Sequence, residues 1–132
     1  RIHGNQIFSN YIKGNTNYGI VIRDQWTGAN TIYNNYFHNR VNANDFSSNT
    51  NWNIEKTPGT NIVGGSYLGG NYWSDYLGRD LDGDGIGDTD TPYKSKGEIS
   101  SGGDYLPLVR RNLGEKGQSN KVEVVVIRAI DP

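Results

Sequence analysis

The sequence predicts an all-β protein built as a short parallel β-helix, a solenoid in which each coil of the chain stacks on the previous one. Asn-x-Ile units recur with a period: Asn5 and Asn30 are 25 residues apart, as are Ile12 and Phe37. A repeat of about this length is typical of a solenoid. The chain is 33% hydrophobic, contains 18 glycines and has a mean hydropathy of −0.73, too little apolar material for a thick globular core.

Residues 1–76 are expected to form the coils. Their apolar residues alternate in short bursts, as in the Tyr-Gly-Ile-Val-Ile segment at 18–22, and do not follow helical spacing. Each burst buries only one or two side chains, so neighbouring coils must stack to make a core. The longer step of 31 residues from Asn30 to Asn61 is expected to contain an insertion at the turn 56–59.

Asparagines at the bends suit such a solenoid. Asparagine tolerates the left-handed backbone region, and its amide can hydrogen-bond to the same residue in the next coil. Asn5, Asn30 and Asn61 form the candidate ladder. The alternative is that these amides line a sugar-binding groove.

Residues 77–108 contain an aspartate-rich loop that predicts a calcium-binding cap. In the twelve-residue calcium loop, side chains bind at positions 1, 3, 5 and 9 and a backbone carbonyl binds at position 7. The matching side chains are Asp80, Asp82, Asp84 and Asp88, and the carbonyl is that of Ile86. Four carboxylates so close repel by roughly 1 kcal/mol per pair in water and about 4 near a protein surface, which favours a bound cation.

The loop departs from an EF-hand at position 12, which is Thr91, followed at once by Pro92. A further oxygen is therefore expected from Asp90, with Asp75 and Asp104 as alternatives. The competing interpretation is a solvated acidic turn, because Asp-Gly pairs are ordinary turn formers. Calcium is the expected cofactor, and it suggests an extracellular or cell-surface location, where free calcium is high.

Five aromatic residues are candidates either for carbohydrate binding or for closing the end of the solenoid. Trp73, Tyr72 and Tyr76 lie just before the acidic loop, and Trp26 and Trp52 are about one coil apart. Such rings can stack on a sugar or cover the last strands of a solenoid against water and edge pairing.

No catalytic residue is assigned. Glycoside hydrolysis needs two carboxylates that face a groove, and lyase chemistry needs a basic residue beside calcium. Asp24, Asp45 and Arg23 are the only candidates on the coils. Two to three coils would leave hardly any groove for such an enzyme.

The remaining residues differ from the repeat. Residues 109–120 are expected to be a linker, and residues 121–132 a C-terminal β-strand. The segment from Lys121 to Ile130 can return along the solenoid, begin another domain or add to the sheet edge of a neighbouring molecule. Because the chain opens inside a repeat with no evident cap, self-association through this strand and the open N-terminal coil is expected as one outcome.

Composition excludes several classes of protein. The chain has no cysteine and no methionine, which removes disulfides and thiolate or thioether metal ligands. Its net charge of −1, with no basic patch, argues against a nucleic-acid partner. No apolar run approaches the roughly 20 residues of a membrane-spanning helix.

The chain resembles the NosD-like parallel β-helix repeat proteins over about residues 1–108. The resemblance is carried by the Asn-x-Ile coils, Lys-Thr-Pro-Gly at 56–59, Gly-Gly-Asn-Tyr-Trp-Ser-Asp-Tyr at 69–76, the Asp80 loop and Pro-Tyr at 92–93. It implies a right-handed β-helix with an aspartate-rich capping segment. It also implies an archaeal or bacterial surface protein, in a class shared with carbohydrate-binding proteins and sugar hydrolases.

The copper-related name of that family is not expected to apply. Copper delivery uses His, Met or Cys, and this chain offers only His3 and His38, which fall out of ladder register. The first hypothesis is a non-catalytic, calcium-stabilised β-helix module of a cell-surface protein with a structural, adhesive or self-assembling role in a filament or layer. The alternative is a carbohydrate-binding module, or a remnant of a polysaccharide lyase or hydrolase.

Overall fold

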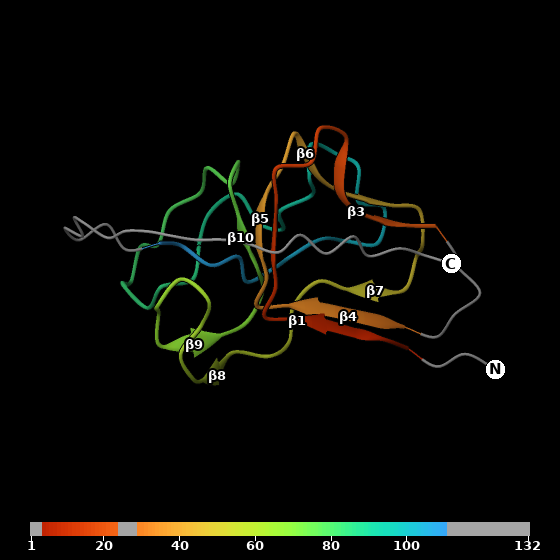
Figure 1. Ribbon diagram of the computed structural model, residues 1–132. Helices are drawn as coiled ribbons and strands as arrows, with labels where there is room; N and C mark the ends of the chain where they lie inside the picture. The colour runs from red at the N-terminus through yellow and green to blue at the C-terminus, as the bar shows by residue number, and fades with distance from the viewer. Residues whose placement is uncertain (1–3, 24–28, 111–132) are drawn as a thin grey trace.

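The computed structural model describes residues 4–23 and 29–110, and its strands are short and joined by turns and loops (Figure 1). No helix occurs within these ranges, so the all-β prediction is confirmed. The strands are β1 (Gln6–Phe8), β2 (Tyr11–Lys13), β3 (Tyr18–Ile22), β4 (Asn30–Tyr33), β5 (Tyr36–His38), β6 (Val41–Asp45), β7 (Thr50–Asn51), β8 (Thr57–Pro58), β9 (Tyr67–Leu68) and β10 (Tyr72–Trp73).

Most strands pair in parallel with the strand that follows one period later in the chain. The parallel sheets have the orders β1-β4-β7, β2-β5-β10 and β3-β6. We call β1, β2 and β3 the first layer, β4, β5 and β6 the second layer, and β7 and β10 the third layer. Ile7 pairs with Ile32 and Ile12 pairs with Phe37, so the 25-residue period is the register of β1 with β4 and of β2 with β5, whereas Tyr18 of β3 pairs with Val41 of β6, a step of 23 residues.

An insertion interrupts the third layer, as the longer repeat step predicted. Between β7 and β10 the chain forms an antiparallel hairpin from β8 and β9. Asn61 lies in the loop of this hairpin, where its Oδ1 accepts hydrogen bonds from the backbone N–H groups of Val63 and Gly65, each at 3.0 Å. The predicted ladder is therefore wrong at Asn61, because this side chain closes a turn instead of stacking on Asn30.

The core lies between the three parallel sheets (Figure 1) and takes inward-facing side chains from successive strands. Ile12, Phe37 and Trp73 follow one another through the sheet β2-β5-β10, and all three are buried. The ring centroids of Phe37 and Trp73 are 4.5 Å apart, and Tyr93 stacks on the other side of Trp73 at 4.2 Å. Stacked rings thus continue the core beyond the last strand.

Asparagine ladders run through the bends between sheets. Asn10 donates from its backbone N and from Nδ2 to Asn35 Oδ1, at 3.0 and 3.1 Å. Asn35 donates in the same way to Asn71 Oδ1, at 3.0 Å from each nitrogen. Shorter ladders join Asn5 to Asn30 and Asn15 to Asn39. At every step the earlier residue donates and the later one accepts, so the ladders have a direction.

Residues 77–110 fold over the third layer in bends and isolated bridges. Ile99 pairs with Asp45 at the end of β6, and Leu108 pairs with Tyr72 of β10. The segment thereby takes the hydrogen-bonding positions that a further strand would use. Most of the predicted linker and the whole segment 121–132, with its Lys121–Ile130 strand, lie outside the described residues, so their role in self-association stays a prediction.

Candidate functional site

The acidic loop brings together three of its predicted ligand side chains. Asp80, Asp82 and Asp88 each offer one carboxylate oxygen, and these oxygens lie within 4.8 Å of one another. Backbone N–H groups hold two of the carboxylates: Gly83 and Gly85 donate to Asp80 at 2.9 and 2.8 Å, and Leu81 donates to Asp88 at 2.6 Å. Gly83 and Gly85 have positive φ angles, of 80° and 90°, and these glycine conformations let the chain turn around Asp80.

The predicted ligand side chains of Asp84 and Asp90 do not join this cluster. Asp84 Oδ2 accepts a hydrogen bond from Lys56 Nζ at 2.8 Å, as the one ion pair in the part of the chain that the structure describes. Ile86 is 3% exposed and pairs with Leu108, so its side chain anchors the loop to the core. Asp90 is exposed and is not part of the carboxylate group.

Local contacts set the charges of the loop. The backbone N–H of Asp84 lowers the pKa of Asp82, but desolvation and the neighbouring carboxylates outweigh it and leave that pKa raised. Burial raises the pKa of Asp84, but the hydrogen bonds from Lys56 and from the backbone N–H of Ile86, with the charge of Lys56, together outweigh it and leave that pKa lowered. Lys56 and several backbone N–H groups therefore stabilise part of the negative charge of the acidic loop.

The longest asparagine ladder ends at a buried carboxylate, Asp104. Its Oδ2 accepts hydrogen bonds from the backbone N of Asn71 at 2.7 Å and from the indole Nε1 of Trp73 at 2.8 Å, and its Oδ1 accepts one from Leu106 N at 2.9 Å. Burial raises the pKa of Asp104 to about 7. In each of these hydrogen bonds Asp104 is the acceptor, so it terminates the ladder.

A second buried carboxylate, Asp45, likewise accepts hydrogen bonds from an indole N–H group and a backbone N–H group. Its Oδ2 accepts from the indole Nε1 of Trp52 at 2.9 Å and from the hydroxyl of Ser101 at 2.5 Å, and its Oδ1 accepts from Ser47 N at 2.8 Å. At 1% exposure, Asp45 cannot meet a substrate. Asp24, the other candidate acid or base, lies outside the described residues.

The structure separates the five candidate aromatic residues. Trp52 and Trp73 are each 1% exposed, so no sugar ring can reach their faces, while Tyr76 is partly buried and donates its hydroxyl to the carbonyl of Thr89. Trp26 lies outside the described residues. Tyr72 alone among the described four stands on the outer side of a parallel sheet, where it stacks on Tyr36 at 4.7 Å.

Tyr72 belongs to a column of rings that the sequence analysis did not identify. Tyr11, Tyr36 and Tyr72 are in register on β2, β5 and β10, and Tyr11 lies 5.3 Å from Tyr36 between ring centroids. Each follows a ladder asparagine and precedes a core residue, in the triplets Asn-Tyr-Ile, Asn-Tyr-Phe and Asn-Tyr-Trp. This repeated Asn-Tyr pair is the signal that could have revealed the column.

Comparison with known proteins identifies one family. The family described as "Periplasmic copper-binding protein (NosD)" matches residues 1–78. No curated protein and no solved structure matches the chain. Within the described residues, no helix is long and apolar enough to cross a membrane.

This match corrects the predicted cofactor. The family is described as copper-binding, which points to copper and not to calcium, so calcium as the expected cofactor is wrong. The described side chains do not fit copper either, because copper sites use imidazole or sulfur ligands. The chain has no cysteine or methionine, and the described potential ligand group contains only the carboxylates of Asp80, Asp82 and Asp88. His38, the one histidine in the described part, is exposed on β5 and is not in that group.

The family match is shorter than the predicted resemblance over residues 1–108: it includes the Asn-x-Ile coils and the run at 69–76, but not the Asp80 loop or the Pro-Tyr pair at 92–93. It covers 78 of the 132 residues and includes all ten described strands, from β1 to β10. The predicted resemblance is therefore confirmed at the level of the family. The chain belongs to the NosD family.

Proposed function

We propose that this chain is a non-catalytic, right-handed parallel β-helix module of a periplasmic or cell-surface protein, with a structural and adhesive role. The observation that carries the proposal is the use of the buried carboxylates. Asp45 and Asp104 are 1% and 0% exposed, and each binds an indole N–H group of the core. Among the described residues, Asp45, a candidate acid or base on the coils, is thus engaged inside the fold.

The parallel pairing supports the β-helix architecture. Strands of the first layer lie beside strands of the second at a constant 25-residue step in two sheets, and the matched family is described as periplasmic. The insertion at β8 and β9 and the segment 77–110 leave the stacking direction unchanged. Handedness and location come from the family resemblance and are part of the proposal.

The test is an activity screen with matched carboxylate variants. The protein is incubated with neutral and acidic polysaccharides, and reducing ends and the ultraviolet absorbance of unsaturated products are followed. We expect no turnover by wild type, Asp45→Asn or Asp75→Asn. Turnover by wild type that either variant abolishes, with its fold intact by circular dichroism, would overturn the proposal.

Carbohydrate binding without cleavage is a second candidate function. It is favoured by the outer position of Tyr72 within a column of three tyrosines, whereas the buried Trp52 and Trp73 do not support it. Binding would provide the adhesive part of the proposed role.

A further inference from the structure

The outer side of the sheet β2-β5-β10 has an unusual composition. Its outward positions are Tyr11, Tyr36 and Tyr72 in one column and Lys13 paired with His38 in the next. We call these five residues, together with Arg110, the tyrosine face. The face contains aromatic, cationic and imidazole side chains but no carboxylate.

Tyr36 and Tyr72 present their ring edges to a ligand, whereas Tyr11, at the end of the column, is exposed and tilted by 41° to Tyr36. Tyr36 and Tyr72 stack with an interplanar angle of 18°, so each ring covers a face of its neighbour. No hydroxyl of Tyr11, Tyr36 or Tyr72 has a hydrogen-bond partner among the described residues. Burial raises the pKa of Tyr72, so its hydroxyl keeps its proton and can donate. The column is therefore a row of hydrogen-bond donors.

Positive charges flank this row and have no carboxylate partner in the described ranges. Arg110 lies over Tyr36 and Tyr72, with its guanidinium carbon 5.7 and 5.5 Å from the ring centroids. Lys13 and Arg110 are exposed, and the ion pair that the structure describes is elsewhere, between Lys56 and Asp84. A planar guanidinium and an ammonium are the groups that bind carboxylate or sulfate.

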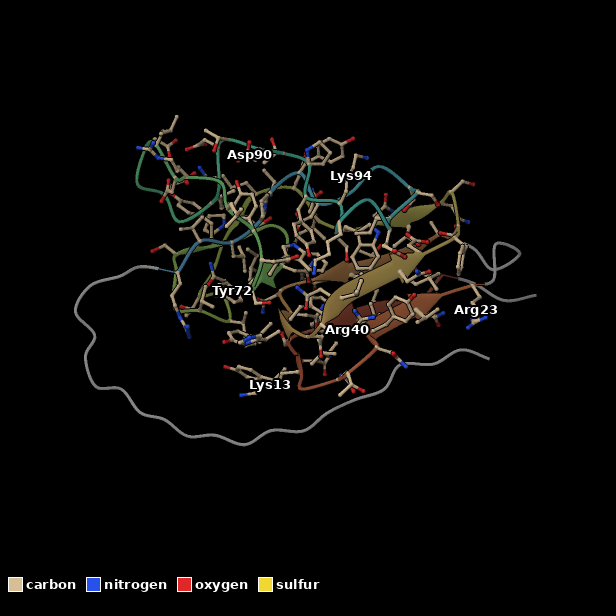
Figure 2. All side chains as sticks on the ribbon, turned by 90° about the horizontal axis from the view of Figure 1, so that it is seen from above. Lys13, Arg23, Arg40, Tyr72, Asp90 and Lys94 are labelled. Atoms are coloured by element: carbon tan, nitrogen blue, oxygen red, sulfur yellow. The ribbon has the colours of Figure 1, made fainter. Side chains whose placement is uncertain are left out.

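The acidic loop borders one end of the tyrosine face, because Ile86 pairs with Leu108 and Val109 N donates to the carbonyl of Gly85 at 2.9 Å, next to Arg110. The acidic cluster of Asp80, Asp82 and Asp88 belongs to the loop after β10. In Figure 2, Lys13 is at the bottom of the view, and Asp90 and Lys94 are at the top. A polyanion is therefore attracted by Lys13 and Arg110, and the carboxylates of the acidic loop limit how far it extends past the Arg110 end of the face.

We propose that the tyrosine face binds an acidic polysaccharide, a glycan that carries carboxylate or sulfate groups, along the direction in which the layers stack. This inference rests on the proposed adhesive function and names its ligand class. Neighbouring strands are about 4.8 Å apart, so the polysaccharide meets one tyrosine hydroxyl in each layer. Lys13 and Arg110 bind its anionic groups.

Two other polyanions fit the same face less well. Single-stranded nucleic acid binds by stacking bases on free aromatic faces, whereas the inner rings here are covered by each other. An anionic membrane surface is bound by polybasic segments or by amphipathic helices with a large apolar side. The tyrosine face has two full positive charges, and its aliphatic groups are the stems of Lys13 and Arg110.

The experiment compares polygalacturonate with its fully methyl-esterified form, which has the same backbone without the charge. Affinity is measured by isothermal titration calorimetry for wild type, Lys13→Gln/Arg110→Gln and Tyr36→Phe. Lys94→Gln is the matched control, because Lys94 is also exposed but lies off the face. We expect binding of the charged polymer only, weakened about tenfold in the double variant and by added salt, unchanged in Lys94→Gln, and reduced in Tyr36→Phe.

Equal binding of both polymers, or an unchanged affinity of the double variant, would refute the proposal. Tighter binding of a single-stranded oligonucleotide or of anionic lipid vesicles would assign the face to another class of partner. Thermal unfolding of each variant shows that its fold is retained. Failure of this inference is separable from failure of the proposed function: the first is absence of binding, and the second is the appearance of turnover.

Discussion

Replacing Asn35 with alanine should destabilise the protein strongly, because this residue is the middle member of the longest ladder. Asn35 is 0% exposed. Its Oδ1 accepts from two nitrogens of Asn10, and its Nδ2 donates to Asn71 Oδ1 at 3.0 Å, to the carbonyl of Ile7 at 2.9 Å and to that of Tyr33 at 3.1 Å. Alanine removes all of these side-chain hydrogen bonds.

The loss of stability follows from the acceptors that Asn35→Ala leaves without a donor. The carbonyl oxygens of Ile7 and Tyr33 lose the hydrogen bonds from the Asn35 amide. Each unsatisfied buried group costs about 1–3 kcal/mol, so the free energy of unfolding should fall by about 2–6 kcal/mol. Asn10→Ala is the matched control, because Asn10 occupies the same ladder position in the first layer but is only partly buried. Water can replace its hydrogen bonds, so its loss should be about 0.5–1.5 kcal/mol.

The assay is urea unfolding of both variants and wild type, followed by the fluorescence of the buried Trp52 and Trp73. Linear extrapolation gives the free energy of unfolding, and an unchanged slope shows that the denatured state is comparable. If Asn35→Ala and Asn10→Ala differ by less than about 0.5 kcal/mol, burial does not control the strength of the ladder and the reasoning is refuted.

Two further predictions concern the end of the ladder. A Cβ added at Gly70 would lie 1.8 Å from Asp104 Oδ1, so Gly70→Ala should lower the free energy of unfolding by about 3 kcal/mol or more, measured by thermal unfolding. The control is Gly59→Ala, which should be tolerated because its added Cβ would lie 3.3 Å from Leu68 Cδ1. Because burial raises the folded-state pKa of Asp104 to about 7, above its ordinary value of 3.8, the folded state binds this proton more tightly than the unfolded state. Stability should therefore fall as pH rises from about 4 to about 7, and Asp104→Asn should flatten that part of the profile; an equal slope in the variant would contradict this assignment.

The period of the sequence was a sound guide to the first two layers. Tyr11, Ile12 and Lys13 lie beside the residues 25 positions later, because parallel stacking repeats the backbone hydrogen bonds at a constant register. The third layer broke the pattern because an insertion displaced it. Asn71, at 36 residues from Asn35, took the ladder position that Asn61 was predicted to hold.

The candidate site was predictable only in part. Loop spacing placed Asp80, Asp82 and Asp88 together, since glycine turns bring alternate side chains to the same side. The spacing could not show that Lys56, 28 residues before Asp84, would take that carboxylate away. The sequence also could not show which aromatic side chain is buried, because Trp73 and Tyr72 are adjacent and face opposite sides of one strand.

The all-β class, the 25-residue step and the family could be read from the residues alone, because they depend on local periodicity and composition. Which polar groups are buried depends on contacts between distant segments, so this became visible only in the folded chain. Asp104 became the end of the asparagine ladder when residues 77–110 folded over β10. The same stacking that buried Trp73 brought Tyr11, Tyr36 and Tyr72 into one outer row.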